Sequence, residues 1–167
     1  MGLLSFIKEA GEKLFDHGKA QAATVEAQAN PADEAKQKAA NDAAGDAIKT
    51  YIESQGLKAT GLTVTYEAGS GTVNVYGVAP DQQTKEKIVL CCGNVKNVSK
   101  VNDNMSVDQS APEAQFYTVV KGDTLSKVSK QYYGDANQYN KIFEANKPML
   151  KSPDLIYPGQ VLRIPPA

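Results

Sequence analysis

The chain has 167 residues, which is enough for one ordinary domain or two small ones. Its 18 Lys and Arg residues balance 19 Asp and Glu residues, and the net charge of -1 excludes the strongly basic surface typical of nucleic-acid binding. No apolar run approaches the roughly 20 residues of a membrane-spanning helix, and charges interrupt the N-terminus from Lys8 onward, unlike a secretory signal. We therefore expect a cytoplasmic protein that binds neither nucleic acid nor membrane.

Residues 1–18 are expected to form an amphipathic helix. Apolar residues recur at helical spacing, at Leu3, Ile7, Ala10 and Leu14. Charged residues of both signs separate them, which favours packing against the rest of the chain over association with a membrane surface.

Residues 19–41 form an alanine-rich linker or helix insertion that is too poor in large apolar groups to build a core of its own. A helix is predicted to begin within it, because Asn30 is a suitable N-cap and Pro31 suits the first helical position. Gly56 is expected to end this helix, whose apolar face near the next element carries Ile48 and Tyr51 together with Ile52.

Residues 42–108 combine helical and strand periodicities in one predicted domain. Apolar residues alternate on both sides of a turn at residues 68–71, which predicts a half-buried hairpin. Pro80 and Asp81 are expected to open a helix, Gly93 to close it, and residues 98–107 to form a last strand. The order helix, strand, strand, helix, strand predicts an α+β fold with an antiparallel or mixed sheet and the helices on one face.

Residues 109–114 have the polar and proline composition of an interdomain linker, and residues 115–167 then predict a second, smaller domain. A strand at 117–120, a helix capped by Asp123 or Thr124, a helix at 137–146 and a strand at 161–164 give the order βααβ.

Three quoted stretches of the second domain resemble the LysM module: YTVVKGDTLSKVSKQYYGD, IFEANK and LIYPGQVLRIP. The first domain resembles a BON domain through VNVYGVAP and GNVKNVSKV. A BON domain followed by a LysM domain, after the N-terminal stretch MGLLSFIKEAGEKLF, is similar to the small cytoplasmic bacterial potassium-binding proteins. This resemblance covers the chain except for the alanine-rich stretch at residues 19–45.

The resemblance implies that the chain binds a potassium ion. K+ is often held by main-chain carbonyls, and a helix end leaves its last four carbonyls without intrahelical partners. The matched stretches FIKEAGEKL and GNVKNV imply an ion shell of main-chain oxygens from Ile7, Ala10, Gly93, Val95 and Asn97. The LysM domain would then dock on the ion-bound surface, and the protein would act as a monomeric ion sensor.

The residues alone favour a simpler interpretation of this region, in which Gly93 is only a helix cap and Gly11 only a tolerated helix glycine. The two cysteines, Cys91 and Cys92, are expected to be small buried apolar groups. A zinc site would need about four ligands, and the chain offers two thiols and the single His17. A calcium loop around Asp103 would lack the required glycine and glutamate.

Two other classes of function remain open. LysM modules usually bind polymers of N-acetylglucosamine, which would here involve Gly122, Asp123, Thr124, Leu125 and residues 155–157. A protein-interaction adaptor with an unidentified protein partner is a further alternative. No serine or cysteine lies in a recognisable nucleophile motif, so we do not expect an enzyme.

Overall fold

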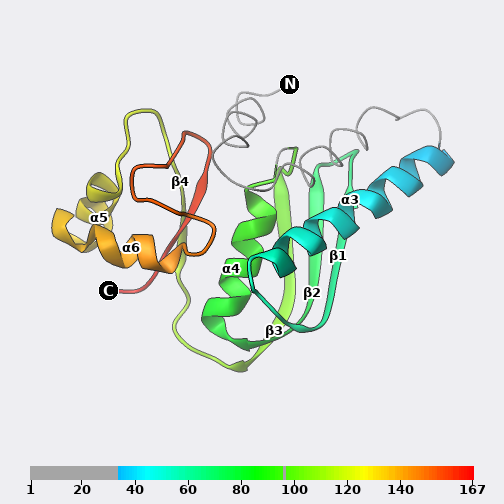
Figure 1. Cartoon of the computed structure of the whole chain (residues 1–167), viewed down its shortest axis with the longest axis horizontal. Helices are drawn as coiled ribbons and strands as arrows, with labels where there is room; N and C mark the ends of the chain where they lie inside the picture. Colours follow the sequence, from blue (N-terminus) through cyan, green and yellow to red (C-terminus); the bar gives the residue numbers. More distant parts are fainter. Residues whose placement is uncertain (1–33, 96) are drawn as a thin grey trace.

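The computed structural model describes residues 34–95 and 97–167, so the helix predicted for residues 1–18 lies outside the described residues. The first domain contains α3 (Glu34–Ser54), β1 (Thr60–Glu67), β2 (Thr72–Asp81), α4 (Gln82–Gly93) and β3 (Lys100–Gln109). Figure 1 shows α3 crossing in front of the sheet that the three strands form and α4 running alongside β3. This confirms the predicted order of helices and strands.

The sheet has the order β1-β2-β3 and is mixed. β1 and β2 form the predicted antiparallel hairpin, whereas β3 pairs with β2 in parallel after the crossover through α4. The alternation of the sequence is borne out, because Leu62, Val64 and Tyr66 of β1 are all buried beneath the helices. α3 lies very close to β1 at Gly45, where an added Cβ atom would come within 2.6 Å of the Val64 carbonyl oxygen.

The core of the first domain lies between the sheet and the two helices. The predicted face of α3 is confirmed, since Ile48, Tyr51 and Ile52 are buried. α4 contributes a row of buried residues, which includes Ile88, Leu90, Cys91 and Cys92. These apolar groups account for the packing of both helices on the same sheet face.

The second domain contains β4 (Gln115–Thr118), α5 (Leu125–Tyr133), the 3-10 helix η1 (Ala136–Gln138), α6 (Tyr139–Ala145) and β5 (Val161–Ile164). β4 and β5 form a two-stranded antiparallel sheet against which the helices bury a separate apolar cluster. The predicted βααβ order is confirmed. None of the helices in residues 34–95 and 97–167 is both long enough and apolar enough to cross a membrane.

Some predicted boundaries shift in the structure, and the structure decides which of the two predicted residues caps α5. The strand expected at residues 117–120 lies at Gln115–Thr118. Thr124 rather than Asp123 caps α5, because the Asp123 carboxylate accepts hydrogen bonds from the Tyr117 hydroxyl (2.6 Å) and the Val120 amide (2.9 Å) instead. Pro80 belongs to the end of β2, and only Asp81 caps α4.

Candidate functional site

The candidate site begins at the C-terminal end of α4. The start of this helix is capped by Asp81, whose side chain accepts a 2.7 Å hydrogen bond from the Thr84 amide. It ends at Gly93, and Asn94 is the C-cap residue, with right-handed backbone geometry and its amide directed at the Leu90 and Cys92 carbonyls. Gly93 is thus the last helical residue and does not serve as the left-handed glycine cap that the sequence suggested.

The next residues turn the chain sharply from α4 toward β3. The Val95 side chain is completely buried in the core, and its carbonyl accepts a 3.2 Å hydrogen bond from the Val98 amide. Asn97 has a φ of 67°. In the part of the chain that the structure describes, it is the one non-glycine residue with a positive φ. The Asn97 carbonyl accepts a 3.2 Å hydrogen bond from the Tyr66 hydroxyl.

The turn of the β1-β2 hairpin holds this loop in place. The Gly71 carbonyl accepts hydrogen bonds from the Ser99 amide (2.8 Å) and from the Lys100 amide (3.3 Å). Gly71 has a φ of +65°, and an added Cβ atom would lie 2.7 Å from the Asn97 carbonyl oxygen. A glycine is therefore required here, and the position of the Asn97 carbonyl is set from two sides, by Tyr66 and by Gly71.

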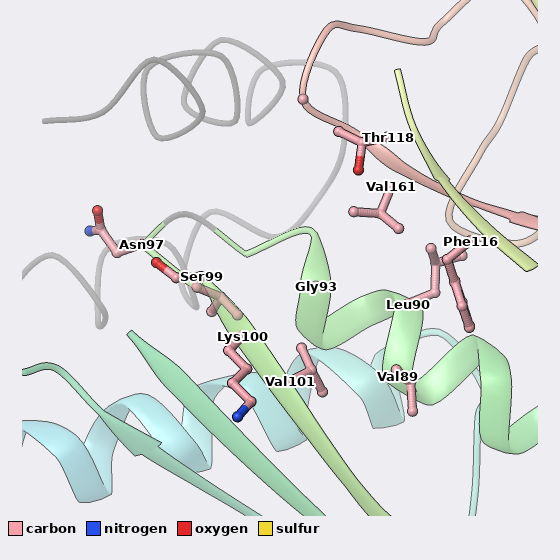
Figure 2. A pocket seen from close by; sticks show the side chains of 12 residues that line it. Val89, Leu90, Gly93, Asn97, Ser99, Lys100, Val101, Phe116, Thr118 and Val161 are labelled. Carbon is pink, nitrogen blue, oxygen red and sulfur yellow. The ribbon is translucent and has the colours of Figure 1, made fainter. Parts of the chain in front are cut away.

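A groove of about 350 Å³ lies between the end of α4, the start of β3 and the strands of the second domain. Gly93 and Asn97 both line it, and Figure 2 shows Val161 and Thr118 on the opposite wall from Gly93. The lining is largely apolar, through residues that include Val89, Leu90, Val98, Val101, Phe116 and Val161.

Three of the five predicted ion-shell residues are among the described residues: Gly93 ends α4, and Val95 and Asn97 follow shortly after it in the chain. Ile7 and Ala10 lie outside the described residues. The Val95 carbonyl accepts a hydrogen bond from the Val98 amide, and the Asn97 carbonyl accepts one from the Tyr66 hydroxyl. Because a carbonyl oxygen has two lone pairs, each can still contribute to an ion.

Cys91 and Cys92 are buried apolar groups of the core, as the sequence predicted. Both side chains are buried in α4, and the two are not joined by a disulfide. Burial raises the pKa of the Cys92 thiol to about 12 and that of the Cys91 thiol well above its usual value, so both stay protonated at neutral pH. Within the described residues, no three His, Cys, Asp or Glu side chains lie close enough to share a metal ion.

Asp103 lies at an exposed position of β3. Its carboxylate forms a 3.2 Å ion pair with Lys85 of α4 and also accepts a hydrogen bond from the Met105 amide. The sequence did not indicate this ion pair, because its two residues lie on different elements, α4 and β3, and come together only when the chain folds.

A second hollow, of about 420 Å³, lies in the second domain. It includes four of the predicted glycan-contact residues, Asp123, Thr124, Leu125 and Ile156, together with Tyr139 and Asp154. Gly122 is not among its lining residues, and Tyr157 is buried in the domain core.

Asn94 was missed by the sequence analysis. Its side-chain amide donates to the Val161 carbonyl (3.0 Å) and accepts from the Val161 amide (2.7 Å), which joins the end of α4 to β5. No local sequence signal could have revealed this contact, because its partner lies in the other domain.

Comparison with known protein families agrees with this architecture. The BON domain model matches residues 40–109, and the LysM domain model matches residues 117–165. The chain belongs to the family of proteins in which a BON domain is followed by a LysM domain.

A whole-length relative carries a functional name. The potassium binding protein Kbp of Escherichia coli is 45% identical over 165 residues, an alignment that covers 99% of each chain. The alanine-rich stretch at residues 19–45, expected to fall outside the resemblance, thus lies within the aligned span. An uncharacterized protein of Deinococcus radiodurans is 34% identical over 130 residues, which cover 71% of this chain and 50% of that protein. The uncharacterized protein YqbP of Bacillus subtilis matches 34% of this chain and 29% of its own length at 41% identity.

Proposed function

We propose that this chain is a non-enzymatic, monomeric, cytoplasmic protein that binds K+ and changes its conformation in response. The name of the Escherichia coli relative supports K+ as the ligand. The observation in this molecule that carries the proposal is that α4 ends at Gly93 beside an open groove, which Gly93 and Asn97 both line and where Asn97 has a left-handed backbone.

The proposed ion shell consists of main-chain carbonyls of Ile7, Ala10, Gly93, Val95 and Asn97. Carbonyl oxygens suit a large, weakly hydrated cation, whereas Ca²⁺ and Mg²⁺ prefer carboxylate clusters. The left-handed backbone of Asn97 supports this assignment, because it costs free energy and redirects the carbonyl of a residue within the loop.

The groove beside the loop is the proposed docking place of residues 1–18. Its apolar wall at Val89, Val101 and Phe116 complements the apolar stripe predicted for that segment. Phe116 is 43% exposed, which leaves apolar surface that a docked helix would cover. Docking there would bring Ile7 and Ala10 near Gly93.

The first test is calorimetric titration of the dialysed full chain with KCl, with NaCl at matched ionic strength as the control. We expect saturable heat with K+ and none with Na+. Binding to the folded state alone would also stabilise it, by about 2.7 kcal/mol when K+ is at 100 times its dissociation constant. A melting temperature that does not respond to K+ would contradict the proposal.

A pair of variants tests the docking place. Phe116→Gln removes apolar surface from the groove, and Val120→Gln makes the same kind of change at a residue that is 56% exposed and does not line it. We expect Phe116→Gln to weaken K+ binding by about tenfold, corresponding to the loss of roughly 1.4 kcal/mol of apolar contact. If the two variants weaken K+ binding equally, residues 1–18 do not dock in this groove.

The second candidate function is binding of N-acetylglucosamine polymers by the LysM domain. The hollow at Asp123, Thr124 and Leu125 favours it, since it offers both carboxylate and hydroxyl groups to a sugar. Titration with a chitooligosaccharide tests this candidate, and saturable binding that Thr124→Val abolishes would support it.

A further inference from the structure

Asn94 joins the two domains through a pair of hydrogen bonds that imitates a neighbouring strand. Its Nδ2 donates to the Val161 carbonyl and its Oδ1 accepts from the Val161 amide, at 3.0 and 2.7 Å. The side chain is well shielded, because Asn94 is only 9% exposed. Both backbone polar groups of Val161 are thereby satisfied by one side chain from the other domain.

The same arrangement occurs once more on the outer edge of β5. Asn146, the C-cap residue of α6, donates to the Arg163 carbonyl (2.9 Å) and accepts from the Arg163 amide (2.8 Å). Alternate residues of a strand direct their backbone groups to the same edge, so Val161 and Arg163 share the edge opposite β4. This edge is completed by two asparagines, of which one belongs to the LysM domain and the other to the BON domain.

Asn94 lies between two residues of the proposed ion shell, Gly93 and Val95. Its own backbone amide is held at the helix end by the Leu90 and Cys92 carbonyls. A change in the direction of either neighbouring carbonyl rotates the peptide units that flank Asn94, and the side-chain amide moves with them. The hydrogen bonds to Val161 therefore depend on the conformation of the loop.

A second contact anchors the same interface independently of the loop. The Glu86 carboxylate, in the middle of α4, accepts hydrogen bonds from the Arg163 guanidinium at 3.0 and 3.3 Å and from the Ala114 amide at 2.7 Å. Glu86 is two helical turns away from Gly93, so this ion pair holds the domains together whatever the loop does.

We propose that Asn94 is a positioning residue that couples the ion-binding loop to the docked state of the LysM domain. This inference rests on the proposed K+ function and specifies how the ion state reaches the second domain. K+ fixes the loop, the loop orients the Asn94 amide, and that amide pairs with Val161. Coupling of this kind is reciprocal. The factor by which K+ favours pairing of Asn94 with Val161 is therefore also the factor by which that pairing strengthens K+ binding.

The test measures amide hydrogen exchange by NMR on the full chain, with and without K+. The Val161 amide reports the contact to Asn94, and the Arg163 amide, bonded to Asn146 on the same strand edge, is the matched internal control. We expect K+ to slow exchange of Val161 at least about fivefold more than that of Arg163. This comparison needs no substitution, so it does not depend on a variant that folds.

Variants complete the test. Asn94→Ala is expected to remove the selective K+ effect on Val161 and to weaken K+ binding about tenfold. Asn94→Asp retains the acceptor for the Val161 amide but loses the donor to the Val161 carbonyl. Its K+ affinity and its K+ effect on Val161 exchange should lie between those of the wild type and those of Asn94→Ala. Asn104→Ala, whose exposed side chain bonds only the Asn102 carbonyl, is the control and should match the wild type.

The outcomes separate the two proposals. If the wild type shows no K+ heat in the calorimeter, the proposed function is wrong and the coupling is wrong with it. If K+ binds but Val161 and Arg163 respond equally, the coupling alone is overturned. If Asn94→Ala binds K+ as tightly as the wild type, Asn94 is only a structural contact between the domains.

Discussion

Asn97 combines an unfavourable backbone conformation with two contacts that maintain it. A left-handed conformation costs an ordinary L-residue roughly 1–2 kcal/mol, and asparagine tolerates it better than most. The Tyr66 hydroxyl holds its carbonyl, and Gly71 leaves room for the same oxygen. The direction of this carbonyl is thus imposed by the folded domain.

Substitution of Asn97 tests how much free energy its left-handed backbone conformation costs. We expect Asn97→Ala to lower the free energy of unfolding by about 1 kcal/mol, because alanine adopts positive φ less readily. Asn97→Gly, which has no such penalty, should stay within about 0.5 kcal/mol of the wild type. Chemical denaturation measures both, and equal stabilities of the two variants would mean that the backbone angle carries no cost.

The two thiols offer a probe of the core that needs no mutation. Cys91 and Cys92 are 1% and 0% exposed, and burial raises the pKa of both. Because the thiolate is the reactive form, we expect neither to react rapidly with a thiol reagent in the native protein near pH 8, and both to react once guanidinium unfolds it. A fast-reacting thiol in the native state would show that the C-terminal half of α4 opens.

At the scale of elements, α4 is the helix on which both domains depend. It packs against β2 and β3 of its own sheet, and its residue Glu86 and its C-cap residue Asn94 contact the LysM domain. In Figure 1 it lies on the side of the BON domain that faces β4. The integrity of this helix therefore affects the candidate site and the domain interface together.

The N-cap of α4 tests this dependence. Asp81→Ala removes the acceptor for the Thr84 amide and should lower the free energy of unfolding by about 1 kcal/mol. Asp81→Asn keeps a good capping side chain and is the matched control, with an expected loss of a few tenths of a kcal/mol at most. Thermal or chemical unfolding distinguishes them, and an equal loss for both would assign the effect to the charge of Asp81 instead of its hydrogen bond.

At the scale of the whole molecule, the domain interface is held by a buried ion pair. Glu86 is 4% exposed and Arg163 is 7% exposed, and Met149 of the LysM domain joins the core cluster of the BON domain. Desolvation makes such a pair costly to break, since removal of one partner leaves the other charge buried.

We expect Glu86→Gln to destabilise the protein by about 3–5 kcal/mol, measured by chemical denaturation, because Arg163 then lacks its countercharge. Combining it with Arg163→Met should recover much of that loss. Glu144→Gln, in the exposed pair with Lys147, is the control and should cost less than about 1 kcal/mol. A loss for Glu86→Gln as small as for the control would mean that water reaches the interface and screens the pair.

Local pattern was sufficient for most of the architecture. Alternation through Val64 and Tyr66 predicted the hairpin, helical spacing predicted the buried face at Ile48 and Ile52, and both element orders were right. These features follow from periodicity, because a half-buried strand and an amphipathic helix must each repeat their apolar residues along the chain. Boundaries were less certain, as the shift of β4 by two residues shows, since strand ends depend on pairing partners.

Only the tertiary structure could decide how the two domains meet. Asn94 with Val161 and Glu86 with Arg163 join residues about 70 positions apart, and nothing in the local composition of either segment indicates its partner. The same holds for the candidate site, where the groove between the domains and the direction of the Asn97 carbonyl arise from contacts with Tyr66 and Gly71. A site built from main-chain oxygens has no required side chain, so its geometry is a property of the folded chain.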